Sequence, residues 1–154
     1  MKSQKKKNVN TDLKSMNDVI LKCYKECPRT QKLHNDFSGY SLNECVNDIL
    51  EKLDELEDYK FVKVEKEELI GYFATTKIED NDILFTFFVR PKFRNKKDLT
   101  FFWNKIKEEF KGDFLAPIFS SNEPAKRFLK RNNGTEVKLT INSKDTSFFE
   151  FTGE

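Results

Sequence analysis

The chain has 154 residues, which suits one domain with a buried core, and 37% of them are hydrophobic while 35% are charged. Aromatic residues reach 14%, which excludes the aromatic-poor composition of a disordered chain. The formal net charge of +2 is too small for a general nucleic-acid binder, and no apolar run approaches the roughly 20 residues that span a membrane. We therefore expect one globular domain with no membrane segment and no specific nucleic-acid motif.

The N-terminal residues 1–9 are rich in lysine and lack the apolar segment of a secretory signal. We expect them to form a basic flexible tail ahead of a single domain over residues 10–154. The three cysteines, an odd number, indicate a reducing compartment. The expected location is cytoplasmic, which means the host cytoplasm or a virion if the gene is viral.

Apolar residues recur at helical spacing in two segments before residue 60. The first segment runs over 13–27 and is followed by Pro28. The second follows Ser41-Leu42-Asn43-Glu44, a capping box in which each polar side chain accepts from the backbone amide of the other residue, and it runs to Leu56. The charged residues between the apolar ones are expected to form the solvent face of each helix.

The apolar residues change to the period of strands after residue 60. A hairpin of 61–64 with 69–75 is followed by 83–89, a run so apolar that we expect a central strand covered on both faces. The later elements are a helix over 99–110, a strand over 114–119, a short helix that Asn122 caps and Asn133-Gly134 breaks, and a closing hairpin of 136–141 with 147–151. This order predicts an α/β (α+β) domain with a mixed, mostly antiparallel central sheet flanked by helices.

Three short motifs lie along these elements. They are Glu68-Leu69-Ile70-Gly71-Tyr72 in the hairpin, Val89-Arg90-Pro91-Lys92-Phe93-Arg94 at the end of the central strand, and Asn122-Glu123-Pro124-Ala125-Lys126-Arg127-Phe128-Leu129 in the short helix. Their order and spacing resemble the GNAT N-acetyltransferase superfamily over about residues 40–152. The resemblance implies a GNAT-like fold, and acetyl-CoA as the cofactor if the protein is active.

The resemblance also implies where coenzyme A would bind. In the family, a loop of the pattern [QR]-x-x-G-x-[GA] presents backbone amides to the pyrophosphate, and its small residues permit a close approach. Here the same frame reads Arg94-Asn95-Lys96-Lys97-Asp98-Leu99. Lys97 and Leu99 replace the small residues, and Asp98 adds a negative charge. We therefore expect lost or weakened cofactor binding.

Eight residues would contact the cofactor if the resemblance extends to the site. The phosphates would be cradled by Arg94, Asn95, Lys96 and Lys97. The pantetheine arm would pair with the backbone of Phe88, Val89 and Arg90, and the thioester would be bordered by Asn122.

The residues that would catalyse acyl transfer are unknown from the sequence. Many family members protonate the departing thiolate with a tyrosine on the later helix, where this chain has Leu129. The central strand over 83–89 contains no acid that could act as a base, and Thr86 is its only polar side chain. The family's first strand has no counterpart, since residues 1–12 are too polar, so the domain either begins with a helix or borrows an edge strand from a partner.

Cys23, Cys27, His34 and Cys45 provide a set of side chains that zinc accepts as ligands. All three cysteines, however, fall on the apolar stripes of the two predicted helices, and free cysteine behaves as a small buried hydrophobe. We therefore predict no metal site.

Two basic groups, 90–97 and 126–131, are expected to lie near each other in the fold. They would bind the polyphosphate of coenzyme A or another anionic partner such as nucleic acid or an acidic protein face, or they form a solvated basic surface. Phe102 and Trp103 fall on the apolar stripe of their helix, while Phe101 falls off it and is expected at a contact surface.

Two functions remain open at this point. The favoured one is a non-catalytic or catalytically degenerate GNAT-fold protein that serves as a structural, assembly or binding subunit, for example of a virus particle, with a protein partner or a second copy of itself. The alternative is an acetyl-CoA-dependent N-acetyltransferase that transfers an acyl group to an amine.

Overall fold

The computed structural model describes residues 13–28, 32, 42–56, 58–119, 122–141 and 144–152. Six strands form one sheet, namely β1 (Tyr59–Glu65), β2 (Leu69–Ile78), β3 (Asn81–Val89), β4 (Phe114–Phe119), β5 (Thr135–Ile141) and β6 (Lys144–Phe151). The helices are α2 (Leu13–Lys25), α4 (Leu42–Glu55), α5 (Lys96–Lys107) and α6 (Glu123–Arg131), with a short 3-10 helix η1 (Pro91–Phe93). No described helix is both long and apolar enough to cross a membrane.

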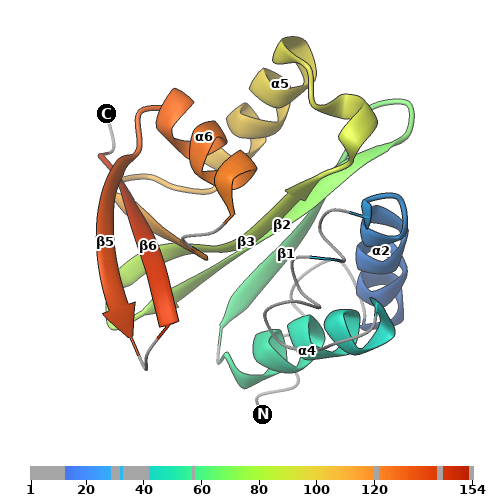
Figure 1. Ribbon diagram of the computed structural model, residues 1–154, viewed down its shortest axis with the longest axis horizontal. Coiled ribbons are helices and arrows are strands. Elements are labelled where there is room, and N and C mark those ends of the chain that lie inside the picture. Colours follow the sequence, from blue (N-terminus) through green and yellow to red (C-terminus); the bar gives the residue numbers. More distant parts are fainter. Residues whose placement is uncertain are drawn as a thin grey trace.

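The strands lie in the order β1-β2-β3-β4-β6-β5 (Figure 1). β3 runs parallel to β4, and the other neighbouring pairs are antiparallel. The predicted mixed, mostly antiparallel sheet is therefore confirmed.

Helices cover both faces of the sheet, and each face has its own core (Figure 1). Helices α2 and α4 pack on one face against residues such as Tyr72, and helices α5 and α6 pack on the other against residues such as Phe73. Neighbouring residues of β2 thus point into different cores, as the alternation of a strand requires. Because both faces are covered, strand β2 is almost wholly buried.

Helix α5 begins at Lys96, earlier than the predicted start at Leu99. The reason is that Asn95 caps the helix, and η1 occupies part of the predicted loop. Phe102 and Trp103 are buried as predicted, while Phe101 is half-buried beneath the ammonium groups of two lysines. The predicted tail over 1–9 and the capping serine, Ser41, lie outside the described residues.

Within the stretch where β2 and β3 pair, β3 contains one extra residue. Ala74 pairs with Thr86 while the next residue, Thr75, pairs with Leu84, so Phe85 has no opposite residue. An extra residue of this kind bends the strand that carries it and increases its local twist. The bulge therefore allows the second half of β3 to run in a different direction from the first half.

Gly71 is required by the close approach of β2 and β3. A Cβ atom at this position would overlap the carbonyl oxygen of Phe88, which is backbone and cannot move aside. We predict that Gly71→Ala lowers the free energy of unfolding by about 1–3 kcal/mol, the usual cost of overpacking.

Gly112 provides the matched control, because a Cβ atom there would meet nothing within 4 Å. Urea unfolding of Gly112→Ala should give a value within about 0.5 kcal/mol of the parent protein. Equal stabilities of the two variants would contradict the packing described for Gly71.

Candidate functional site

The parallel strands β3 and β4 separate soon after they meet. Their register is limited to Ile83 with Leu115, near the start of both strands, and the bulge of β3 follows directly. Two residues farther along β4 is Pro117, which has no N–H to donate to a ladder. We call the opening between 86–89 of β3 and 116–119 of β4 the strand split.

The register of β3 shows which backbone groups face the strand split. The N–H of Arg90 donates to the carbonyl of Ile70 at 2.8 Å, so these two residues are a hydrogen-bonded pair. Such pairs alternate with non-hydrogen-bonded pairs in antiparallel strands, which makes Val89 and Gly71 a non-hydrogen-bonded pair. The N–H and C=O groups of Val89, and those of Phe87 two residues earlier, therefore point away from β2 and toward the split.

Two hydrogen bonds between Asn95 and Asp98 occupy the N-terminus of α5, next to the end of β3. The Asn95 side chain accepts from the Asp98 amide at 2.9 Å and donates to the Asp98 carboxylate at 2.8 Å. Lys66 also donates to this carboxylate at 3.1 Å. The Asn95 hydrogen bond, and then that of Lys66, lower the pKa of Asp98. The helix terminus that would attract an anion thus already carries a fixed negative charge.

Lys96 and Lys97 both extend from the first turn of α5 with exposed side chains. Among the described residues, neither lysine forms an ion pair. They provide positive charge beside the split, but they lack the small size that lets a backbone approach a phosphate.

The Arg94 side chain folds back onto the end of β3. Its Nε donates to the Val89 carbonyl at 2.8 Å, and one Nη lies 3.9 Å from the Cys27 sulfur. The guanidinium carbon is 5.1 Å from the centre of the Phe88 ring. The Val89 carbonyl, one of the two backbone groups of this residue that face the strand split, is therefore bound by Arg94.

Arg90 links α2 to the sheet through a side chain that is only 4% exposed. Its guanidinium donates to both carboxylate oxygens of Glu26 at 2.8 Å and to the Leu69 carbonyl at 2.6 Å. The hydrogen bond from Arg90 lowers the pKa of Glu26. The arginine guanidinium thus holds the C-terminus of α2 against the point where β3 ends.

Helix α6 follows β4 in the chain and packs on the same face of the sheet as α5. The Asn122 side chain accepts from the Ala125 amide at 3.4 Å and caps the helix. Leu129 is fully buried in the core, so the position where the family often has its tyrosine is an apolar packing site. The Phe128 ring of α6 lies 5.5 Å from the ring of Phe87 on β3.

Two tyrosine hydroxyls lie on the opposite face of β3. The hydroxyl of Tyr72 donates to that of Tyr24 at 3.1 Å, and burial raises the pKa of Tyr72 well above its ordinary value. Tyr24 lies with its ring 4.8 Å from Phe88. Both hydroxyls are buried in the core, so neither stands in the split as a proton donor.

Two of the four residues considered as zinc ligands have described side chains. Cys23 and Cys27 are both buried, and burial raises the pKa of Cys23 to about 12. His34 and the side chain of Cys45 lie outside the described residues. No group of three or more metal-ligating side chains occurs within the part of the chain that the structure describes.

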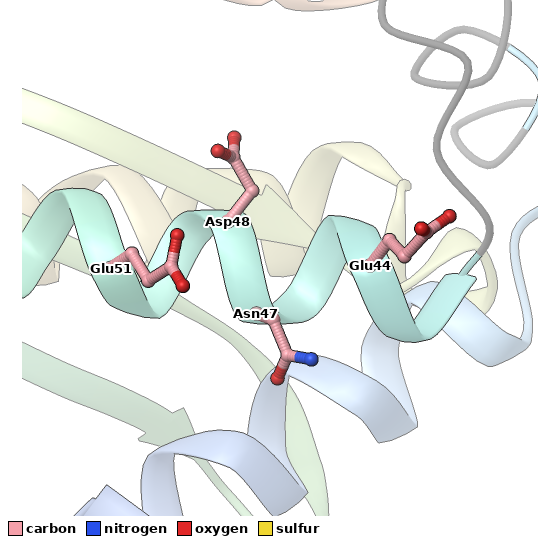
Figure 2. Close-up of a pocket in the computed structure, with 4 residues that line it drawn as sticks. All are labelled: Glu44, Asn47, Asp48 and Glu51. Carbon is pink, nitrogen blue, oxygen red and sulfur yellow. The ribbon is translucent and has the colours of Figure 1, made fainter.

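The outer face of α4 carries a shallow depression lined by Glu44, Asn47, Asp48 and Glu51 (Figure 2). Asp48 forms an ion pair with Lys52 at 3.0 Å. In Figure 2 the four side chains leave the helix in different directions. The depression belongs to an acidic solvent-facing surface on the side of the sheet away from α5.

The architecture is an α/β fold with helices on both faces of a sheet that opens between two parallel strands. Comparison with solved structures identifies it as the GNAT fold. An acetyltransferase from Thermus thermophilus superposes with a TM-score of 0.69 at 14% identity, covering 88% of this chain and 90% of that one. A GCN5-related N-acetyltransferase from Brucella melitensis gives 0.63 at 11% identity, covering 92% of this chain and 72% of that one.

A third similar structure contains the coenzyme. The PaiA N-acetyltransferase from Thermoplasma acidophilum, in complex with coenzyme A, superposes with a TM-score of 0.52 at 18% identity, covering 91% of this chain and 93% of that one. No protein-family model matches the sequence, and no curated protein matches it. The likeness therefore concerns the fold.

Seven of the eight predicted cofactor-binding residues lie between the end of β3 and the start of α5, and the eighth, Asn122, caps α6. The structure also adds groups that the sequence reasoning missed, namely Phe87, Lys66 and Glu26. The side-chain alternation of the strand could have indicated Phe87. Nothing in the sequence indicates the other two, because they lie 32 residues from Asp98 and 64 residues from Arg90, respectively.

We predict that Glu26→Ala lowers the free energy of unfolding at pH 7 by about 1–2 kcal/mol. Hydrogen bonds to charged groups contribute roughly 1.5–3 kcal/mol, and the 43% exposure of the Glu26 side chain reduces the loss. The matched control is Glu67→Ala, an exposed glutamate of the neighbouring turn, which should change stability by less than about 0.5 kcal/mol.

The acid side of the pH profile gives a second readout for the same pair. Because the folded-state pKa of Glu26 is lowered, its contribution to stability is present above the ordinary value of 4.5 and is lost as the pH falls below it. The difference in the free energy of unfolding between the parent protein and Glu26→Ala should therefore disappear between about pH 5 and pH 3. A stability difference between the two proteins that stays constant across this pH range would contradict the ion pair.

Proposed function

We propose that this GNAT-fold chain acts as a binding or assembly subunit and does not transfer acetyl groups from acetyl-CoA. The observation that carries the proposal is the Asn95–Asp98 pair at the N-terminus of α5. A coenzyme pyrophosphate at this helix end would lie against the Asp98 carboxylate. At a separation of about 5 Å, the repulsion between two such charges is roughly 1–3 kcal/mol, and the Lys66 ion pair moves it toward the lower end.

The residues around the split support a non-catalytic role as well. Leu129 packs in the core where a proton donor would be needed, and the part of β3 beside the split provides no carboxylate. The hydroxyl of Thr86 is hydrogen-bonded to buried Tyr72. General acid and base catalysis contributes typically about 10²–10⁴-fold, so a site without either group would be a slow one.

The second candidate is an N-acetyltransferase that uses acetyl-CoA. The strand split favours it, because the backbone groups of Phe87 and Val89 face an opening between parallel strands. The likeness to a structure solved with coenzyme A also favours it. Lys96 and Lys97 would then contribute the charge that holds the phosphates.

Thermal unfolding with acetyl-CoA distinguishes the two functions. A ligand at about 100 times its dissociation constant stabilises the native state by about 2.7 kcal/mol. We expect a stabilisation far below this value at millimolar acetyl-CoA, and no release of free thiol in the presence of amine acceptors. A shift of this size together with steady thiol release would establish the enzyme.

A substitution at Asp98 tests whether its charge is the obstacle. Asp98→Ala should tighten binding of coenzyme A about fivefold, which corresponds to about 1 kcal/mol. Glu108→Ala, at the C-terminal end of the same helix, is the matched control and should leave the affinity unchanged. Calorimetric titration measures both, and equal affinities of the two variants would contradict the role given to Asp98.

A further inference from the structure

We propose that Asn133-Gly134 is a site of spontaneous deamidation that the fold keeps closed, and that the reaction detaches strand β5 from helix α6. The dipeptide occurs once in the sequence and lies in the turn between these two elements. The turn contributes no residue to the site at β3 and α5, so this inference stands independently of the proposed function.

The chemistry requires only the two residues and water. The backbone nitrogen of Gly134 bonds to Cγ of the Asn133 side chain, and the side-chain nitrogen leaves as ammonia with the proton that the backbone nitrogen gives up. Water then opens the resulting succinimide ring at either of its carbonyls. One product is aspartate, and the other is isoaspartate, in which the backbone runs through the side chain and is longer by a methylene group. Glycine favours the attack because it carries no side chain that would hinder it.

Two backbone hydrogen bonds close the turn. The N–H of Gly134 donates to the Leu129 carbonyl at 2.9 Å, and the N–H of Asn133 donates to the Lys130 carbonyl at 3.0 Å. With Asn133 in the left-handed region at φ 74°, these bonds form the Schellman motif that ends α6. The attacking nitrogen is thus held in a hydrogen bond to the helix end. Deamidation therefore proceeds from the locally opened turn, at a rate reduced to the fraction of molecules that are open.

The Phe151 ring packs against the inner side of the turn. A Cβ atom on Gly134 would lie 2.6 Å from the ring carbon Cζ, so the ring and the glycine backbone are in close contact. Phe151 is buried and stacks on Phe114 with ring centres 4.7 Å apart. Asn133, on the outer side, is exposed to water. The turn is therefore packed on one side and supplied with water on the other.

The turn joins α6 to the last strand in the order of the sheet. β5 begins at Thr135, and β6 is its neighbour among the described strands. Glu136 holds β5 to the helix, because Lys130 lies 3.2 Å and Lys126 lies 3.5 Å from its carboxylate. An extra methylene group in the turn would displace this carboxylate from both lysines and break the Schellman hydrogen bonds. An edge strand has a neighbour on one side alone, so β5 is the element that the isoaspartate product releases.

Peptide mapping by mass spectrometry tests the site. The protein is incubated in warm, neutral buffer with and without urea, and the deamidated fraction is followed at each asparagine. We expect Asn133 to react first in urea and at least about tenfold more slowly in the native protein, which corresponds to a turn that is open less than about a tenth of the time. No preference for Asn133 in urea would overturn the site. Equal rates with and without urea would overturn the closed turn.

Two phenylalanine variants test whether the packing of the turn controls the rate. Phe151→Leu removes the ring that covers Gly134 and should raise the native-state rate at Asn133 at least about threefold. Phe149→Leu is the matched control, because it removes a buried ring from the same strand and core, but one that is not among the groups nearest to Gly134. The effect of this control should be smaller. Equal acceleration by the two variants would contradict local opening of the turn.

Thermal unfolding of the separated products tests the release of β5. The isoaspartate form should melt at least about 4 °C below the parent, because it loses the end of α6 and the ion pairs to Glu136. Asn133→Asp is the control with an ordinary backbone, and it should melt within about 2 °C of the parent, since aspartate tolerates the left-handed region. Hydrogen exchange of the amides over 135–141 should rise in the isoaspartate form alone. An isoaspartate form that melts and exchanges like Asn133→Asp would refute the release of the strand.

Discussion

The bulge at Phe85 is the feature on which the rest of the site depends. It follows the single register pair of β3 with β4, and an extra residue of this kind bends the strand that carries it, so we attribute to it the opening between the two parallel strands. The opening leaves the backbone groups of Phe87 and the N–H of Val89 facing away from β2, while the Val89 carbonyl accepts a hydrogen bond from Arg94. Because both faces of the sheet are covered by helices, the opening is held by two packed cores.

Two ion-paired groups fix the borders of this opening. The buried guanidinium of Arg90 holds α2 through Glu26, and the Asp98 carboxylate holds the start of α5 to the β1–β2 turn through Lys66. The first pair stabilises the fold around the split. The second stabilises the start of α5 and places a negative charge there, and this charge is the basis of the proposal that the site is unsuited to a nucleotide phosphate.

Much of the fold could be predicted from the sequence, and the site only in part. The layers of helix and sheet could be predicted from the spacing of apolar residues, because a helix and a strand bury one face at different periods. This spacing is helical in α2 and α4 and changes to that of a strand at β1. The bulge could not be predicted, since the run over 83–89 is apolar at almost every position and contains no break. Asn95 and Asp98 have the spacing of a helix cap, but the resemblance assigned them to a phosphate loop. The partner of Arg90 lies 64 residues away, and no local pattern specifies it.

The central proposal is that the Asn95–Asp98 pair keeps a nucleotide pyrophosphate from the start of α5. Amide chemical shifts of the isotope-labelled protein test it most directly, with pantetheine and coenzyme A added separately. The account predicts that both ligands shift the amides of Phe87 and Val89, and that coenzyme A adds little at Lys96 and Lys97. Strong coenzyme-specific shifts at these two lysines, with none at Phe87 and Val89, would contradict it.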